Sequence, residues 1–371
     1  MTSNLSTVLA TIDTKLLAEI ARLGETIPYA ADGSGYGRFP KKVSWWTNGF
    51  WPGLMWQRYA ATGNARFRAV AEQVEQRLDE NFVTFTSLHH DVGFMYGLSA
   101  VADYQQTGNP KSRVRGLHAA TILAGRYNPN GQFIRSWDDP GTEGWVIIDS
   151  MMNLPLLYWA SETTGDPRFA AIAAKHAETV AAHHIRADGT VRHICVFDPN
   201  TGVQTDVLKG QGYAANSAWA RGQAWAIAGF AQAYTYFGRP EWLRVATKVT
   251  DQFLTHVTAN GGIPKLDLRQ PAEATMTDTS ALVAAATGII PLLPAVPATK
   301  REQYRTQLFG ALKTLLATQV NLDPSQDGIL WGFSTAYDKP AEQGISSVYG
   351  DYYLVMALMQ LQATFGDDCL Q

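Results

Sequence analysis

One short turn occurs four times in the sequence, and this repeat is the feature that most limits the fold. The four turns are Thr62-Gly63-Asn64-Ala65, Thr107-Gly108-Asn109-Pro110, Thr164-Gly165-Asp166-Pro167 and Phe237-Gly238-Arg239-Pro240. In each turn a glycine suits the end of one helix, and an Asn, Asp or Pro suits the start of the next. Longer loops, rich in Gly and aromatic residues, alternate with these turns. The chain is therefore predicted to be a series of helical hairpins whose long loops emerge together at one end.

Helical periodicity accounts for most of the sequence and predicts twelve helices. Their ranges are 4–23, 49–62, 65–82, 91–106, 109–126, 148–164, 167–184, 217–236, 239–257, 278–292, 298–318 and 349–365. The odd-numbered helices carry charged stripes, whereas the even-numbered ones are nearly uncharged, as buried helices are. Six charged helices outside six apolar ones describe an all-α (α/α)6 barrel. An open superhelix of helical pairs is the alternative, and the count of six favours closure.

Three local features qualify this pattern. Pro155 should kink the sixth helix or delay its start. Residues 190–197 alternate in polarity between Asp-Gly and Asp-Pro turns, which predicts a small β-hairpin within 185–214. Residues 320–348 are predicted to form a long loop over the open end, and loops of this length inside a compact domain are usually functional.

Composition limits the class of protein. The 371 residues could form two domains, but no linker or change in composition divides them, so one domain over 1–371 is expected. The 30 Lys+Arg residues nearly balance the 33 Asp+Glu residues, which gives no electrostatic reason to expect nucleic acid or a membrane as partner. The N-terminus reads as an amphipathic helix and not as a secretion signal. With only Cys195 and Cys369, the chain suits a reducing compartment, and a cytoplasmic location is expected.

Polar residues stand at the start of all six apolar helices. They are Thr47-Asn48, His90-Asp91, Asp149-Ser150, Asn216-Ser217 with Arg221 one turn later, Asp278-Thr279-Ser280, and Asp351. Helix capping explains any one of them, and Asp278 and Asp351 are interpreted as caps or scaffold. In a ring, however, all six starts share one rim. Asp91 and Asp149 would then face each other as the paired carboxylates that glycoside hydrolysis requires.

The surroundings of these residues suggest individual roles. Asp149 lies in an apolar segment, which should raise its pKa and suit it to act as an acid. His90 and His193 are candidates to donate hydrogen bonds, whereas His183-His184 look like a C-terminal helix cap. Arg221 is the one cation on an otherwise apolar helix, so an anionic group is expected near it. The candidates are Asp149, Asp91 and a substrate carboxylate, and a purely structural buried ion pair is the alternative.

Other chemistries find no support in the sequence. No metal-ligand spacing and no nucleotide-binding or nucleophile motif is present, so neither a metal nor a cofactor is expected. Cys195 is interpreted as a small buried hydrophobe. Aromatic residues gather near the loops, at Trp45, Trp46, Trp51, Trp137, Trp145, Trp219 and Trp225. Flat aromatic walls suit sugar rings, with core packing as the alternative.

Five blocks of sequence resemble the unsaturated glucuronyl hydrolases, glycoside hydrolase family 88. They are WTNGFWPGLMW from Trp46, HHDVGFMY from His89, EGWVIIDSMMNLPLLYWAS from Glu143, GQGYAANSAWARGQAWA from Gly210 and GDYY from Gly350. The blocks follow the family order along nearly the whole chain. The resemblance implies an (α/α)6 barrel that needs no metal or cofactor. It also implies action on unsaturated oligosaccharides that lyases release from glycosaminoglycans and similar uronic-acid polymers.

The resemblance implies a mechanism and a set of site residues. The C4=C5 double bond of a terminal unsaturated uronic acid is hydrated, and the resulting hemiketal opens and expels the aglycone. Asp149 matches the acid/base position, and Asp91 matches a second aspartate that contacts substrate hydroxyls and tunes the acid. Residues matching the subsite for the unsaturated sugar are His90, His193, Gln211, Arg221 and Trp225, with Trp137 and either Trp45 or Trp46 stacking on sugars. Sulfate preference stays open, because Ser334, Lys339, Ser346 and Ser347 in the C-terminal loop have no assigned counterparts.

Two other enzyme classes compete with this interpretation. Unsaturated rhamnogalacturonyl hydrolases share the fold and the hydration chemistry, but the HHDVGF and WARGQAW blocks favour the glucuronyl family. A sugar 2-epimerase would need paired histidines on inner helices, where this chain offers only His89 and His90 at one helix start. The expected partner is an unsaturated oligosaccharide, bound by a monomer or homodimer.

Overall fold

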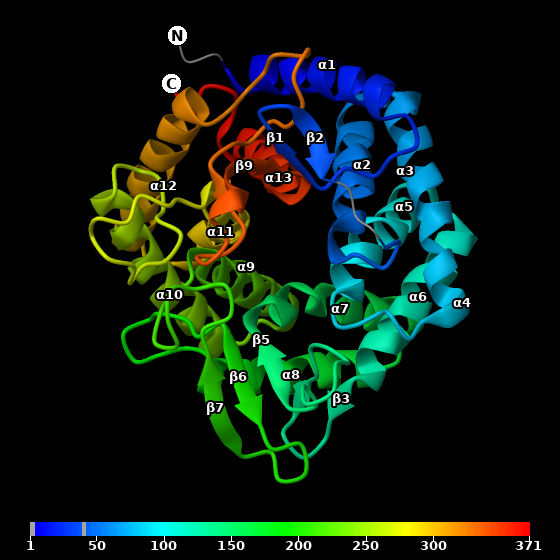
Figure 1. The fold of residues 1–371 in the computed structure, drawn as a ribbon, viewed down its shortest axis with the longest axis vertical. Coiled ribbons are helices and arrows are strands. Elements are labelled where there is room, and N and C mark those ends of the chain that lie inside the picture. The colour runs from blue at the N-terminus through cyan, green and yellow to red at the C-terminus, as the bar shows by residue number, and fades with distance from the viewer. Residues whose placement is uncertain (1–3, 39–41) are drawn as a thin grey trace.

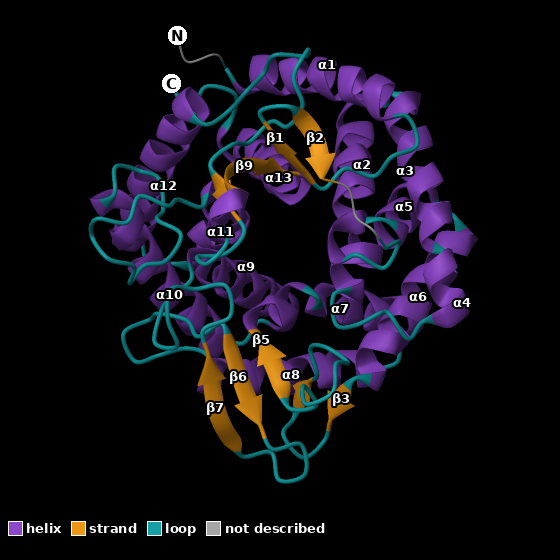
Figure 2. Cartoon of the chain, viewed as in Figure 1, coloured by secondary structure: helices purple, strands orange, loops and turns teal. Residues whose placement is uncertain are grey.

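The computed structural model describes residues 4–38 and 42–371, and most of them are helical (Figure 2). The principal helices are α1 (Leu5–Leu23), α2 (Phe50–Thr62), α3 (Ala65–Leu78), α5 (Ala100–Thr107), α6 (Pro110–Gly125), α7 (Leu154–Thr164), α8 (Arg168–His183), α9 (Ala220–Phe237), α10 (Pro240–Ala259), α11 (Thr279–Leu292), α12 (Ala298–Thr318) and α13 (Val348–Phe365). These twelve fall within the twelve predicted ranges, apart from one- or two-residue differences at their ends. The prediction of a mainly helical protein is confirmed.

The helices are arranged around a centre, as Figure 1 shows. Along the inner side α7 contacts α9, α9 contacts α11, α11 contacts α13, and α13 contacts α2, which contacts α5. The outer helices α3, α6, α8, α10 and α12 each pack on the inner helix that precedes them or follows them in the chain. The apolar helices α9 and α11 are buried along nearly their whole length, whereas α3 and α10 bury one face. The alternation of charged and apolar helices thus corresponds to outer and inner positions.

The four repeated turns end helices as predicted. Gly63, Gly108, Gly165 and Gly238 have φ values of 69°, 73°, 73° and 68°, which is the left-handed region that glycine adopts without strain. Asn64, Asn109 and Asp166 then accept hydrogen bonds from the backbone N–H two residues later. These turns keep consecutive helices antiparallel and adjacent.

Three predicted helices are interrupted, two of them at inner positions and one in the outer layer (Figure 1). The segment predicted as 91–106 contains one π-helical turn, η2 (Gly93–Gly97), and α5 begins only at Ala100 after a distorted Ser99. The segment predicted as 148–164 starts with the 3₁₀ helix η3 (Ile148–Met152), and α7 begins at Leu154, so Pro155 delays the helix and does not kink it. The predicted helix 65–82 divides at Asp79 into α3 and the short α4 (Glu80–Thr84).

Short strands form within the long loops between the helices. β6 (Ile194–Phe197) and β7 (Gln204–Leu208) form the predicted hairpin, and β5 (Trp145–Ile147) adds a third strand. A second sheet has the order β2-β1-β9-β8 and joins β1 (Ala30–Asp32) and β2 (Gly35–Arg38) to β9 (Gln343–Ser347) and β8 (Phe333–Ser334). The third is a two-stranded ribbon of β3 (Tyr127–Asn128) and β4 (Phe133–Ile134). Segment 320–348 is therefore not an unstructured loop, because β8 and β9 fix it against the N-terminal region.

The interior is one continuous cluster of apolar side chains that extends from Leu5 to Leu370. Cys195 lies in this cluster, where burial raises the pKa of its thiol to about 12, which confirms its interpretation as a small hydrophobe. Among the described residues, no helix combines the length and apolar character that crossing a membrane requires.

Candidate active site

The structure brings Asp91 and Asp149 together, as the sequence predicted. Asp91 lies just before η2 and Asp149 lies within η3. Asn153 joins them, because its Nδ2 donates to Asp91 Oδ1 over 3.1 Å and to the backbone oxygen of Asp149 over 3.3 Å. Its Oδ1 accepts a hydrogen bond from the backbone N–H of Phe94 over 2.7 Å. One buried amide therefore fixes the two helix starts relative to each other.

Asn153 was not among the predicted site residues. Its only sequence signal is a polar side chain four residues after Asp149 in an otherwise apolar segment. The close approach also requires Gly93, since a Cβ there would lie 2.5 Å from Asn153 Cα. The π-helical turn and this glycine are thus explained by the proximity of two helices that carry the carboxylates.

Burial governs the electrostatics of Asp91. Its pKa is raised to about 8, mainly by burial and further by the charge of Asp149, while the hydrogen bond from Asn153 and the charge of Arg126 oppose the rise. His90 Nε2 lies 3.4 Å from Asp91 Oδ1, and His89 Nδ1 lies 3.5 Å from Asp91 Oδ2. Burial lowers the pKa of His90 well below its usual value and that of His89 to about 4, so both rings are neutral near pH 7.

His193 faces Asp149. Its Nε2 lies 3.5 Å from Asp149 Oδ2, and its Nδ1 accepts a hydrogen bond from the backbone N–H of Gln211 over 3.0 Å. Because Nδ1 accepts, the proton of the neutral ring is on Nε2 and points toward the carboxylate. The ring also packs on Trp219 with 4.5 Å between centroids. His193 therefore lies beside Asp149, but its Nε2 makes no hydrogen bond among the described residues.

Arg221 has a partner other than the two carboxylates. It forms a buried ion pair with Asp278, so pairing with Asp91 or Asp149 was wrong and the structural ion pair was right. Its Nη2 donates to the backbone oxygen of Thr335 over 2.9 Å, and Gln211 Nε2 donates to the same oxygen over 2.7 Å. Arg221 and Gln211 thus hold the C-terminal loop beside the site.

The remaining predicted caps act as scaffold. Asp351 accepts hydrogen bonds from the backbone N–H groups of Ile329 and Leu330 and from the Tyr36 hydroxyl. Asp278 stands at the start of α11 and accepts from the Ser280 hydroxyl as well as from Arg221. Both aspartates therefore anchor other segments, and neither reaches the pair of carboxylates.

His183 and His184 stand at the C-terminal end of α8 as predicted, since the helix ends at His183 and His184 is its C-cap residue. Their side chains have further partners, and His183 Nδ1 lies 2.7 Å from Gln204 Oε1 on β7. His184 Nε2 lies 3.2 Å from the backbone oxygen of Val146 on β5. Both rings thus bind the neighbouring sheet, while the backbone N–H of His184 caps the helix by donating to the backbone oxygen of Val180.

The tryptophans separate into core and accessible groups. Trp225 is 1% exposed and packs on Phe94 and Tyr353, so core packing describes it better than an open sugar platform. Trp46 packs on Phe50, Phe94 and Tyr349, whereas Trp45 is 40% exposed. Trp137 is partly exposed and lies with its ring edge toward His90, 6.3 Å between centroids. Trp45, Trp46 and Trp137 all keep exposed surface that a ligand could contact, and Trp45 keeps the most.

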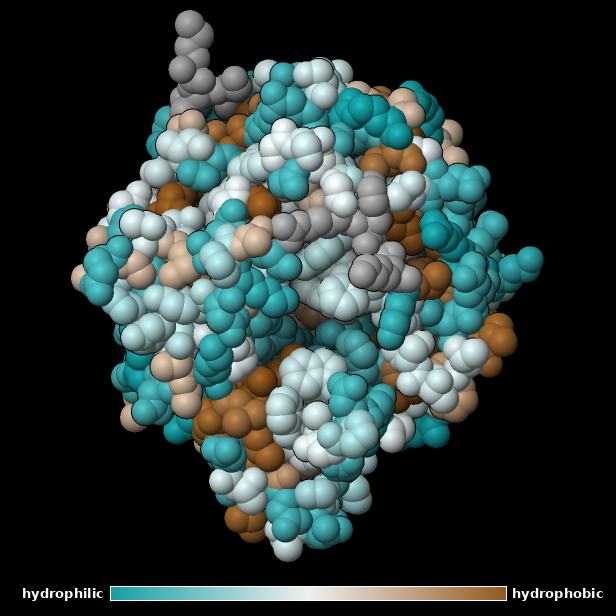
Figure 3. Space-filling view, in the orientation of Figure 1, coloured by the Kyte–Doolittle hydropathy of each residue, from teal (hydrophilic) through white to brown (hydrophobic). Residues whose placement is uncertain are grey.

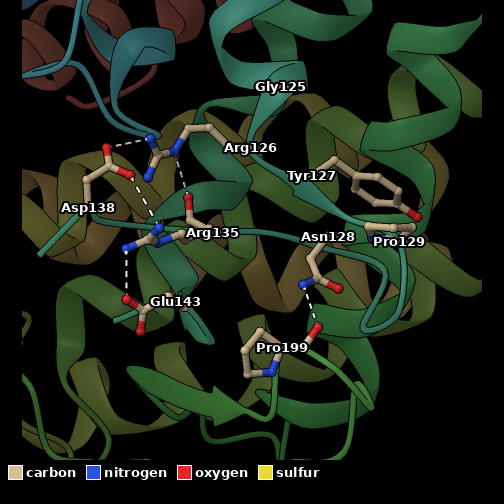
Figure 4. A pocket seen from close by; sticks show the side chains of 9 residues that line it. All are labelled: Gly125, Arg126, Tyr127, Asn128, Pro129, Arg135, Asp138, Glu143 and Pro199. Carbon is tan, nitrogen blue, oxygen red and sulfur yellow. Dashed lines mark hydrogen bonds and ion pairs between the residues drawn. The ribbon is translucent and has the colours of Figure 1, made fainter. Parts of the chain in front are cut away.

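A polar pocket of about 340 Å³ lies beside the loop that carries Trp137 (Figure 4). Arg126 pairs with Asp138 across 2.7 Å and donates to the backbone oxygens of Leu88 and Ser136. These bonds tie the chain just before His89 to the loop before Trp137. The face shown in Figure 3 is hollowed near its centre and is bordered largely by hydrophilic side chains.

Two sets of residues bear on metals and sulfate. In the part of the chain that the structure describes, His89, His90 and Asp91 are the group able to supply three cation ligands, with ligand atoms within 4.8 Å of one another. Ser346 and Ser347 are buried, and Ser347 accepts from the backbone N–H of Gly350 as the cap of α13. Lys339 lies on the surface 3.8 Å from Glu342.

Comparisons with known proteins show which family this chain is similar to. The model of Glycosyl Hydrolase Family 88 matches residues 20–260. An unsaturated glucuronyl hydrolase of Bacillus sp. (strain GL1) is 32% identical over 355 residues, which cover 92% of this chain and 93% of that protein. An unsaturated chondroitin disaccharide hydrolase of Streptococcus pyogenes serotype M1 is 33% identical, over 85% of this chain and 80% of that protein. The crystal structure of the unsaturated glucuronyl hydrolase from Bacillus sp. GL1, responsible for the degradation of glycosaminoglycan, matches with a TM-score of 0.90 at 29% identity, over 98% of this chain and 97% of that one.

Proposed function

Because the chain belongs to glycosyl hydrolase family 88, we propose that it is a glycosidase that releases the 4,5-unsaturated uronic acid from the non-reducing end of lyase-generated oligosaccharides. The chain is one catalytic domain with the (α/α)6 barrel architecture. The observation that carries the proposal is the pair of aspartates joined through Asn153 at the start of two inner helices, with Asp91 buried and Asp149 half-buried. The names of the relatives favour glycosaminoglycan fragments, such as unsaturated chondroitin disaccharides, as substrates.

Asp149 serves as the acid and then as the base. Its carboxyl transfers a proton to C4 of the substrate, and the resulting carboxylate takes a proton from the water whose oxygen bonds to C5. The product is a hemiketal at C5. Its ring opens, and the aglycone then leaves from C1 as a free alcohol. Asp149 Oδ2 is buried, makes no hydrogen bond among the described residues, and lies 3.5 Å from Nε2 of His193. The Nε2–H of His193 stabilises the carboxylate form at the end of the step.

Asp91 supplies the protonated partner. With a pKa of about 8 it is mostly neutral at pH 7, so the two carboxyls do not repel each other as two anions would. In this state Asp91 can also donate to a substrate hydroxyl.

The sugars contact the accessible rings. Trp137 and Trp45 provide the stacking surfaces, and His90, Gln211 and Arg221 line the subsite for the unsaturated sugar. The ion pair between Arg221 and Asp278 keeps that wall in place while Trp225 packs behind it. The active form is a monomer or a homodimer.

The test follows the loss of the ultraviolet absorbance of the conjugated double bond. We expect the purified protein to remove this absorbance from unsaturated chondroitin or hyaluronan disaccharides, and Asp149→Asn to abolish the loss while the fold is kept. The panel includes sulfated disaccharides and fragments of gellan, xanthan, ulvan and pectin. Activity on pectin fragments alone would favour a rhamnogalacturonyl hydrolase, and unchanged absorbance with every substrate would exclude hydration of the double bond.

A further inference from the structure

Two buried histidines of the outer layer hold the segment that carries Asp149. His176, on α8, accepts a hydrogen bond at Nδ1 from the backbone N–H of Ile134 over 2.9 Å, and its Nε2 lies 2.6 Å from Ser150 Oγ. His184, directly after α8, has its Nε2 3.2 Å from the backbone oxygen of Val146. Both side chains are fully buried. Helix α8, which lies behind β5 in Figure 1, therefore binds the chain on both sides of Asp149.

The direction of these hydrogen bonds follows from the chemistry of the partners. Because His176 Nδ1 accepts from an amide, its proton is on Nε2 and is donated to Ser150 Oγ. The Ser150 hydroxyl in turn donates to the backbone oxygen of Ile147 over 2.6 Å. Burial lowers the pKa of His176 to about 3, so the ring is neutral near pH 7 and the bonds keep their direction there.

The same network reaches Asp149 from the side of β4. Ser136 Oγ accepts a hydrogen bond from the backbone N–H of Ile147 over 3.0 Å, while the backbone oxygen of Ser136 accepts one from the backbone N–H of His90 over 3.3 Å. Ile134, two residues earlier, is the residue that His176 binds. His176 thus ties α8, β4 and η3 together behind the two carboxylates.

The orientation of the Asp149 side chain depends on these hydrogen bonds. Its Oδ2 makes no hydrogen bond among the described residues, and Nε2 of His193 lies 3.5 Å from it. Its direction therefore also depends on the backbone of η3, whose next residue, Ser150, is the one that His176 holds. A displacement of about 1 Å at a reacting group can lower a rate by roughly a hundredfold.

We propose that His176, acting through Ser150, is a positioning residue that aims Asp149 at the substrate. The inference rests on the proposed function, in which Asp149 is the acid. His176 touches neither substrate nor reacting atoms in this arrangement. Its effect is therefore expected on kcat, which reports the chemical step, and only weakly on KM.

Two variants separate the two hydrogen bonds of His176. His176→Asn places its amide near the former Nδ1, so it keeps the bond to Ile134 and loses the bond to Ser150. His176→Gln reaches the former Nε2 and keeps the bond to Ser150. We expect kcat to fall roughly ten- to a hundredfold in the Asn variant with KM within about twofold, and the Gln variant to recover most of the rate. His183→Asn is the matched control on the same helix, since His183 binds Gln204 and not the Asp149 segment.

Amide hydrogen exchange gives a readout that does not depend on turnover. We expect exchange of the amides of residues 147–152 to rise about tenfold in His176→Asn, and to stay near the wild-type rate in His176→Gln and His183→Asn. Equal kcat values for the Asn and Gln variants, or unchanged exchange in the Asn variant, would overturn the positioning role. If the wild-type protein hydrates no substrate, the proposed function fails, and the exchange data still decide whether His176 holds the segment.

Discussion

The side-chain nitrogen of Asn153 donates to two acceptors: Asp91 Oδ1 over 3.1 Å and the backbone oxygen of Asp149 over 3.3 Å. This contact connects two segments that are 62 residues apart in the chain. It also opposes the rise in the pKa of Asp91 that burial causes. Asn153 therefore affects both the spacing of the two carboxyls and the pH at which one of them ionises.

Asn153→Ala should lower activity and shift its pH dependence. The hydrogen bond from Asn153 favours the ionised form of Asp91, so its loss should raise the pKa of Asp91 further above its value of about 8. The limb of the kcat/KM profile that reports Asp91 should then move to higher pH, and kcat should fall by about tenfold or more. Asn130→Ala, which removes an exposed side chain bound to Pro199, should leave the profile unchanged. If kcat falls but the pH profile of kcat/KM does not shift, Asn153 does not influence the pKa of Asp91.

Gly210→Ala should disrupt the site through His193. A Cβ at Gly210 would lie 2.0 Å from His193 Nδ1, so the ring must leave the position from which its Nε2 faces Asp149. We expect kcat to fall by about tenfold or more. Gly108→Ala is the matched control, because Gly108 has a similar positive φ of 73° but no atom within 4 Å of the new Cβ. It should lose only stability, about 1 kcal/mol, and keep its rate. Equal loss of activity in both variants would point to backbone strain as the cause.

The turns, the helix count and the pair of aspartates were predictable because their signals are local. Glycine caps and apolar periodicity act within a few residues, and they place Asp91 and Asp149 at helix starts. The partner of Arg221 was not predictable, since Asp278 is 57 residues away and had an adequate explanation as a cap. Asn153 and His176 escaped notice for the same reason: each looks like an ordinary helix residue until folding brings it to Asp91 or Ser150. The strands β1 and β9 also depend on pairing between the two ends of the chain.

Asp278→Ala should destabilise the fold strongly. It leaves the guanidinium of Arg221, which is 2% exposed, without its carboxylate, and breaking a buried pair in this way costs about 3–5 kcal/mol. KM should rise as well, because Arg221 holds Thr335 and, through it, Gln211. Asp338→Ala removes the carboxylate of the exposed pair with Lys209 and should cost at most about 1 kcal/mol. Thermal unfolding of the two variants measures the difference, and equal midpoints would show that the Arg221 pair contributes little.

Glu19→Gln should change the pH dependence of stability. Glu19 lies on α1 beside Lys15 and accepts a hydrogen bond from the backbone N–H of Gly328, so it anchors the segment before β8. Burial, with a further contribution from the charge of Asp351, raises its pKa from 4.5 to about 8. Between these values the folded state binds more protons than the unfolded state, so this group lowers stability as the pH rises through that window.

Glutamine keeps the acceptor for Gly328 and removes the titration. The variant should therefore gain stability relative to the wild type between about pH 5 and about pH 8.5, as measured by the difference between their unfolding midpoints. Glu72→Gln is the control, because Glu72 forms an exposed pair with Arg68 on α3. The difference in unfolding midpoint between Glu72→Gln and the wild type should be nearly the same at about pH 5 and about pH 8.5. A Glu19→Gln variant whose relative stability does not change over this range would show that Glu19 ionises in the folded protein much as it does in the unfolded chain.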